Sequence, residues 1–182
     1  MTAVNVAGLL REPSGTSRRL RLRDHYLSLA PDVELAGPLD ADLELQRTNR
    51  GILVRGRVDA PLRRLCGRCT DAFVEQVSAP IIEEFLPSID PHTGQPLATP
   101  EGDEEARTID ERHEIDLDPV LHDELVLTEP MLSLCRIDCP GLCSGCGRRL
   151  DEGSCSCVVD ELDPRLAVLA SLLERTTGSD LD

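Results

Sequence analysis

The chain has 182 residues, enough for one domain or one and a half, and 40% of them are hydrophobic, enough to bury a core. No apolar run approaches the ~20 residues that a membrane-spanning helix needs, and the N-terminus lacks the basic start and apolar stretch of a signal peptide. These features argue against a membrane protein, and we expect a soluble, cytoplasmic one.

The net charge of −15 is distributed unevenly along the chain. Residues 1–68 contain 12 Arg and 8 acidic residues, whereas residues 69–182 contain 7 Arg and 26 acidic residues; there is no Lys. The overall acidity argues against non-specific binding of nucleic acid by the whole surface. Arg suits phosphate contacts because its guanidinium is a planar fork of donors, although exclusive use of Arg can equally reflect codon bias.

The first half of the chain alternates between apolar and polar residues, which is typical of strands. In residues 17–23, Leu20 and Leu22 lie on one face and three Arg on the other, which predicts a half-buried strand with a basic outer face. Residues 33–86 predict an antiparallel meander, with a turn in which Gly51 takes the left-handed conformation. Gly56 indicates a bulge or close packing in mid-strand.

Helices are predicted outside this meander. Residues 4–11 are compatible with a short helix capped by Asn5. A second helix should start with Asp118 as N-cap and Pro119 at the first helical position, and end before Pro130. A final amphipathic helix should follow Asp163.

The expected fold class is α+β, with an antiparallel meander or barrel-like sheet, a cysteine-rich zinc-binding segment and two amphipathic helices. The predicted parts are a β-rich part (1–86), a disordered acidic loop (87–113), a helical and cysteine-rich part (114–175) that folds together with 1–86, and a tail (176–182). The loop is predicted because Pro, Gly and acidic residues replace the alternation there.

The eight cysteines are the strongest chemical signal in the sequence. Zn²⁺ binds four thiolates in a tetrahedron, and closely spaced pairs of cysteines supply two ligands each. Spacing divides the eight into two Cys₄ sets without remainder: Cys66, Cys69, Cys135 and Cys139, which would tie the two halves of the chain together, and Cys143, Cys146, Cys155 and Cys157. Gly147, directly after Cys146, permits the positive φ of a metal-binding turn.

Other interpretations of the cysteines stay open at this point. Cys139 could instead join Cys143 and Cys146, which would leave Cys135 over. An iron–sulfur cluster would accept the same ligands. Disulfides would need an oxidising compartment, and a redox-active pair at Cys66 and Cys69 would usually start a helix after a parallel strand.

The sequence contains no phosphate-binding glycine loop, no His-Glu-x-x-His pattern and no nucleophile motif. Each four-cysteine set would be coordinatively closed, as in structural rather than catalytic zinc sites. We therefore expect a protein that is not an enzyme.

Four motifs in order make the chain resemble the YceD family, also called large ribosomal RNA subunit accumulation proteins. They are Leu65-Cys-Gly-Arg-Cys-Thr70, Cys139-Pro-Gly-Leu-Cys-Ser-Gly-Cys-Gly147, Cys155-Ser-Cys157 and Asp163-Pro-Arg-Leu-Ala-Val-Leu-Ala170. The resemblance implies a cytoplasmic bacterial protein that supports synthesis, processing or stability of large-subunit ribosomal RNA. Some members lack the cysteines that match the second set, which favours a structural role for it.

The resemblance and the charge asymmetry together suggest that a basic N-terminal sheet faces RNA phosphates. The candidate RNA-facing residues are Arg19, Arg21, Arg23, Arg50, Arg55, Arg57, Arg64 and Arg68. The expected partners are ribosomal RNA or large-subunit precursor particles, and no small-molecule substrate. Two alternatives are an acidic chaperone or zinc donor for a basic ribosomal protein, and a thiol redox protein.

Overall fold

The computed structural model describes residues 2–27, 34–97, 106–153 and 155–157. The chain divides into two compact units, Met1–Gly67 with Asp71–Cys135, and Arg68–Thr70 with Arg136–Asp182. The segment 114–135 belongs to the unit that contains the sheet, whereas most of the cysteine-rich segment belongs to the other unit. The predicted final helix lies outside the described residues.

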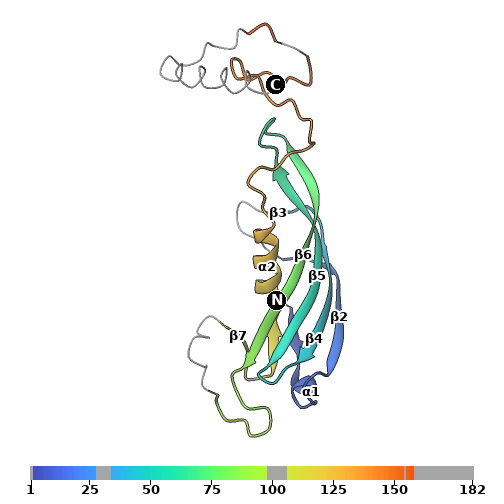
Figure 1. The fold of residues 1–182 in the computed structure, drawn as a ribbon, viewed down its shortest axis with the longest axis vertical. Coiled ribbons are helices and arrows are strands. Elements are labelled where there is room, and N and C mark those ends of the chain that lie inside the picture. Colours follow the sequence, from blue (N-terminus) through green and yellow to red (C-terminus); the bar gives the residue numbers. More distant parts are fainter. Residues whose placement is uncertain (1, 28–33, 98–105, 154, 158–182) are drawn as a thin grey trace, which may run out of the picture. The chain divides into compact units, whose positions relative to one another are not determined.

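A single main sheet organises the first unit (Figure 1). Its strands follow the order β2-β4-β5-β6-β7, and β3 also pairs with β5. All pairs are antiparallel except β6 with β7. The strand bounds are β2 (Ser17–His25), β3 (Glu34–Leu35), β4 (Leu39–Arg47), β5 (Ile52–Leu65), β6 (Ala72–Pro87) and β7 (Arg107–Ile109).

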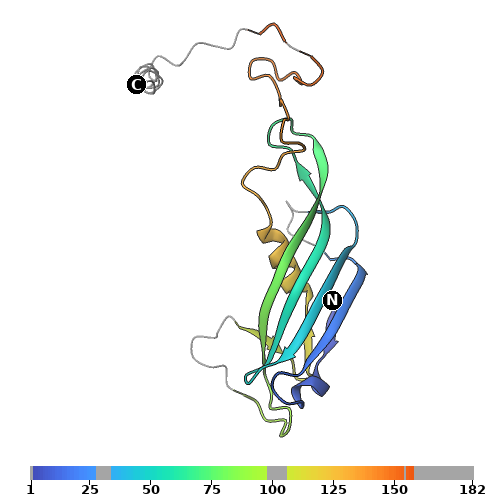
Figure 2. The same cartoon turned by 45° about the vertical axis from the view of Figure 1, so that its right-hand side comes forward.

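The predicted meander is confirmed, but barrel-like closure is wrong. Within the described residues, β2 and β7 are not paired with each other, so the sheet stays open. A helix, α2 (Asp118–Leu127), covers one face of the sheet instead, as Figures 1 and 2 show. Strands β1 (Ala3–Asn5) and β8 (Glu114–Asp116) form a separate two-stranded sheet.

The core follows from the alternation in the sequence. Inward residues of adjacent strands are aligned in register, as in Leu45 opposite Val54 and Val58 opposite Ala79, and all four are buried. Helix α2 buries Val120, Leu121 and Leu125. Burial of this apolar surface, at about 25 cal/mol per Å², is the main force that holds helix and sheet together.

Glycines permit two close approaches of the backbone. A Cβ on Gly56 would lie 2.1 Å from the Asp42 carbonyl oxygen, so Gly56 marks close packing within a continuous register rather than a bulge. Gly51 does not take the predicted left-handed conformation. Its role is steric, because a Cβ there would lie 2.0 Å from the Phe85 carbonyl oxygen.

The predicted helix starts need correction. The N-cap of α2 is Leu117, not Asp118, and no side chain caps the helix. Asp118 instead accepts a hydrogen bond from His25 Nε2 at 3.0 Å. The N-terminal helix α1 is shorter than predicted (Ala7–Leu10), and Asn5 Oδ1 accepts a hydrogen bond from the Ala7 amide at 3.1 Å.

Part of the predicted acidic loop is structured. Residues 107–109 form β7 beside the end of β6. Ile89 and Pro96 form an isolated bridge, and Asp90 Oδ1 accepts hydrogen bonds from the amides of His92 and Thr93, both at 2.8 Å. Residues 98–105, which include Glu101, Asp103, Glu104 and Glu105, lie outside the described part of the chain.

Candidate metal centres and nucleic-acid interface

The eight cysteines gather in two clusters, and either could hold a metal ion. The first comprises Cys66, Cys69, Cys135 and Cys139, and the second comprises Cys143, Cys146, Cys155 and Cys157. Within each cluster all four sulfur atoms lie within 4.8 Å of one another. This is the division that spacing predicted, and the alternative in which Cys139 joins Cys143 and Cys146 is not observed.

The first cluster starts where β5 ends. The Cys66 amide donates to the Asp71 carbonyl at 2.9 Å and the Gly67 amide donates to the Ser133 carbonyl at 2.8 Å. These bonds close the connection between β5 and β6 and hold it beside the segment that carries Cys135. Cys66, Cys69 and Cys139 are buried, whereas Cys135 is exposed.

The second cluster is built on a tight turn. The Gly147 amide donates to the Cys143 carbonyl at 2.8 Å, and Gly147 has a φ of 69°, as the sequence predicted. The Gly145 amide points at Cys143 Sγ, with an N–S distance of 3.4 Å. Amide donors directed at a sulfur are typical of turns that bind metals through thiolates.

The pKa values of the second cluster show how crowded its sulfurs are. A hydrogen bond from Cys155, followed by backbone amides of Cys146 and Gly145, lowers the pKa of Cys143 to about 6. A hydrogen bond with Cys146, then ones with Cys155 and Cys143, raise the pKa of Cys157 to about 12. If all four were ionised, sulfurs within 4.8 Å of one another would repel, and a soft divalent ion would neutralise them.

No disulfide links any of the eight cysteines, all of which lie in the described part of the chain. Four-thiolate sites suit Zn²⁺ and iron–sulfur clusters alike. The geometry therefore supports metal binding without identifying the metal.

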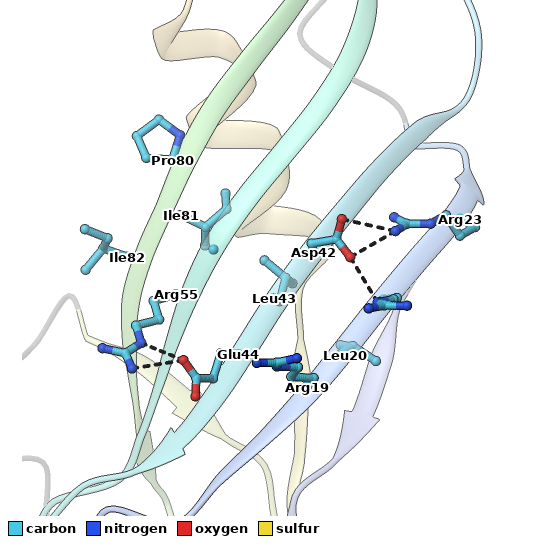
Figure 3. Close-up of a pocket in the computed structure, with 12 residues that line it drawn as sticks. Arg19, Leu20, Arg23, Asp42, Leu43, Glu44, Arg55, Pro80, Ile81 and Ile82 are labelled. Atoms are coloured by element: carbon cyan, nitrogen blue, oxygen red, sulfur yellow. Dashed lines mark hydrogen bonds and ion pairs between the residues drawn. The ribbon is translucent and has the colours of Figure 1, made fainter.

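A second feature of interest is a hollow of about 800 Å³ on the outer face of the sheet (Figure 3). Arg19, Arg21, Arg23 and Arg55 line it, so four of the eight predicted RNA-facing residues come together there. Its remaining lining residues are Leu20, Asp42, Leu43, Glu44, Gly56, Pro80, Ile81 and Ile82.

Two carboxylates that were not among the predicted site residues organise these arginines. Asp42 accepts hydrogen bonds from Arg23 at 2.9 and 3.1 Å, and Arg55 Nη2 lies 2.9 Å from Glu44 Oε2. The pKa of Glu44 is lowered by hydrogen bonds from Ser17 and then Arg55. Four guanidinium groups against two carboxylates leave the lining of the hollow net positive.

The other four predicted arginines do not line the hollow, although Arg57 pairs in register with Asp42 and Pro80, which do. Arg57 is exposed on β5, and Arg50 is exposed in the turn between β4 and β5. Arg64 does not face RNA as predicted, because it lies on the inner face of the sheet with 4% of its surface exposed. Arg68 donates to the Cys139 carbonyl at 2.9 Å.

Comparison with known proteins identifies the class to which this fold and its cysteine clusters belong. Residues 54–173, more than half of the chain, match the family described as large ribosomal RNA subunit accumulation protein YceD. The chain belongs to the YceD family, as its motifs indicated.

Two proteins similar to this chain are mycobacterial. An uncharacterized protein of Mycobacterium tuberculosis (strain ATCC 25618 / H37Rv) is 36% identical over 143 residues, and the match covers 78% of this chain and 65% of that protein. An uncharacterized protein of Mycobacterium leprae (strain TN) is 31% identical over 143 residues, with coverage of 78% and 62%. The match thus spans less than two thirds of the length of these relatives.

Two negative findings, one from comparison with solved structures and one from the helices of this chain, complete the description. No solved structure matches the chain. None of the helices in the described residues combines the length and the apolar character needed to cross a bilayer.

Proposed function

We propose that this protein is a cytoplasmic, non-enzymatic factor that supports synthesis, processing or stability of large-subunit ribosomal RNA by contacting RNA phosphates in the arginine-lined hollow. The observation that carries the proposal is the net positive hollow on the sheet of a chain that belongs to a family named for large-subunit ribosomal RNA. The net charge of −15 on the chain as a whole would disfavour RNA contact outside this hollow.

The chemistry of the hollow suits phosphate better than bases. Guanidinium groups bind phosphate oxygens through two parallel hydrogen bonds. The sequence has only three aromatic residues, Tyr26, Phe73 and Phe85, so base stacking has few platforms. We therefore propose recognition of the RNA backbone and its shape rather than of a sequence.

The metal centres have a structural role in this proposal. Each Cys₄ set would bind one Zn²⁺ with all four positions filled by thiolates, which leaves no open position for a substrate. The ion of the first cluster would cross-link distant parts of a chain whose core is poor in aromatic side chains, whereas the ion of the second would order only the local segment 143–157.

The test compares RNA affinity of two charge-matched double variants. Arg19→Ala with Arg55→Ala removes two guanidinium groups from the hollow. Arg11→Ala with Arg112→Ala removes two exposed arginines elsewhere on the same unit. The probe is a large-subunit precursor RNA transcribed in vitro, and binding is titrated at several salt concentrations.

We expect the variant with Arg19→Ala and Arg55→Ala to bind the RNA about tenfold more weakly than wild type, or weaker still. The slope of log K plotted against log [salt] should become shallower by about 1.5 to 2, because two phosphate contacts are lost. The control variant should bind like wild type. Equal affinities of wild type and both variants would refute the RNA-binding role of the hollow. Sedimentation of tagged protein with large-subunit precursor particles tests the wider assignment.

A second candidate function is a chaperone or zinc donor for a basic ribosomal protein. The strong acidity of residues 69–182, with 26 acidic residues against 7 Arg, favours it. In that case the tagged protein would co-purify with a free basic protein rather than with precursor particles, and loss of Arg19 and Arg55 would not weaken the complex.

A further inference from the structure

The two cysteine clusters differ in how far they are buried. In the first cluster Cys66, Cys69 and Cys139 have relative exposures of 1%, 5% and 3%, and Cys135 is exposed. In the second only Cys143 is buried, at 8%, while Cys155 is half-buried and Cys146 and Cys157 are exposed. The second cluster thus offers an incoming ligand two exposed ligand residues and one half-buried one, whereas the first offers one exposed residue and three buried ones.

The clusters also differ in how their ligands are spread along the chain. The second takes all four ligands from residues 143–157, outside the regular strands and helices of the described chain. The first takes its ligands from the β5–β6 connection and from the segment after α2, as far apart as Cys66 and Cys139. Opening the second requires only a local loop movement, whereas opening the first disturbs a buried strand end.

These differences would affect how fast a bound metal exchanges. A chelator or an acceptor thiolate must reach the ion and replace protein thiolates one at a time. Local openings cost far less free energy than disruption of a hydrogen-bonded core. The Cys66 and Gly67 amides are hydrogen-bonded at the strand end, so release from the first cluster includes this cost.

We infer that Cys143, Cys146, Cys155 and Cys157 form an exchangeable site for a thiophilic divalent cation such as Zn²⁺, while Cys66, Cys69, Cys135 and Cys139 retain their ion. The second site can pass its ion to another thiolate site without loss of the fold. This inference rests on the metal binding in the proposed function but not on RNA contact.

The experiment uses the full chain loaded with Zn²⁺ and an excess of the chromogenic chelator 4-(2-pyridylazo)resorcinol. Absorbance follows metal release, and circular dichroism follows the sheet in the same sample. Pulses of N-ethylmaleimide during release, followed by peptide mass spectrometry, identify the cysteines that have lost their metal.

We expect two phases that differ at least tenfold in rate, each releasing one ion per chain. During the fast phase Cys143, Cys146, Cys155 and Cys157 should become alkylated, and the circular dichroism of the sheet should not change. A single phase, or alkylation of Cys66, Cys69 and Cys139 in the first phase, would overturn the inference.

Paired variants provide an independent check. Cys146→Ser with Cys157→Ser should remove the fast phase and leave the melting temperature within about 2 °C of wild type. Cys66→Ser with Cys69→Ser should remove the slow phase and lower the melting temperature. If this double variant fails to fold, the order in which the cysteines of wild type are alkylated decides whether the second cluster releases its ion first. A chain without bound metal would refute the metal-binding proposal as well, whereas failure to bind RNA would leave this inference intact.

Discussion

Arg64 Nε lies 2.6 Å from Glu75 Oε2, a contact that joins β5 to β6 although the Arg64 side chain is only 2% exposed. Arg64 also forms an ion pair with Glu129, and its Nη2 donates to the Thr128 carbonyl at 3.3 Å, just beyond α2. The Nε and Nη1 contacts are close ion pairs rather than aligned hydrogen bonds. A buried charge needs partners of opposite charge, and those of Arg64 come from β6 and from the residues just after α2. Arg64 therefore links the end of α2 to the sheet.

Replacement of Arg64 by Ala should therefore destabilise the protein strongly. The change leaves Glu75 and Glu129 without their shared cation and removes the contact with Thr128. Loss of one partner of a buried ion pair costs about 3 to 5 kcal/mol, and because both carboxylates are partly exposed we expect about 3. Urea unfolding followed by circular dichroism measures the change in the free energy of unfolding.

Arg63→Ala is the matched control for this substitution. Arg63 precedes Arg64 in β5, but its side chain is 50% exposed and its Nε lies 3.4 Å from Glu34 Oε2. An exposed pair of this kind contributes about 1 kcal/mol or less. Equal losses of stability in the two variants would show that burial does not set the contribution of Arg64.

Gly56→Ala tests the close approach of β5 to β4. A Cβ there would meet the Asp42 carbonyl oxygen at 2.1 Å and the Leu43 Cα at 2.9 Å, and both are backbone atoms of the paired strand. Backbone cannot rotate away as a side chain can, so we expect a loss of about 2 to 3 kcal/mol in the free energy of unfolding. The same denaturation experiment measures it.

Gly8→Ala is the control for this glycine. Gly8 lies in α1, and a Cβ there would meet the Arg18 Nη2 atom at an ordinary 3.5 Å. Since Ala favours a helix over Gly by up to about 1 kcal/mol, this variant should be as stable as wild type or slightly more stable. A stable Gly56→Ala variant would contradict the assigned strand register.

Local patterns in the sequence predicted much of the first unit. Alternation predicted β2 and the meander of β4, β5 and β6, because strands with one buried face have a fixed side-chain period. The same alternation places Arg64 on the inner face with Leu62, so its burial was available from the sequence. Charge alone does not distinguish Arg64 from the outward-facing arginines, whereas the alternation does.

Other features depend on contacts that the sequence does not display. Whether the sheet closes depends on pairing between distant edge strands, and β7 arises within a segment that looked disordered. The hollow combines residues from β2, β4, β5 and β6, and the role of Asp42 and Glu44 follows only from the register of those strands. For the cysteines, short spacing predicted the second cluster, whereas the first depends on contact between Cys66 and Cys69 and the distant pair Cys135 and Cys139, which left the place of Cys139 open in the sequence.

Asp123→Asn tests a pH-dependent contact between α2 and β7. A hydrogen bond from His122 Nδ1 at 2.9 Å, and then contact with Arg107, lower the pKa of Asp123. The pKa of Asp in an unfolded chain is about 3.9. Because the pKa of Asp123 is lower in the folded protein, its carboxylate contributes its full stabilisation at pH values above about 3.9, and this contribution is lost as the pH falls through the folded pKa.

The advantage of wild type over Asp123→Asn should be present at neutral pH and vanish in acid. Because the side chain is 54% exposed, we expect less than about 1 kcal/mol. Unfolding by urea at pH 7 and near pH 3 measures the difference at each pH. Asp138→Asn, at a side chain that is 86% exposed, is the control and should cost less. A difference that grows on acidification would contradict this assignment.

Metal analysis tests the partition of the cysteines into two clusters. Protein purified under anaerobic conditions should contain two Zn²⁺ per chain, because each cluster brings four sulfurs within 4.8 Å of one another. Titration of this protein with a thiol reagent should find few reactive cysteines at early times and eight after denaturation in a chelator, since coordinated thiolates react slowly. If the protein contains iron and absorbs visible light, an iron–sulfur cluster replaces the zinc assignment. Eight thiols that react at once in metal-free, folded protein would refute metal binding altogether.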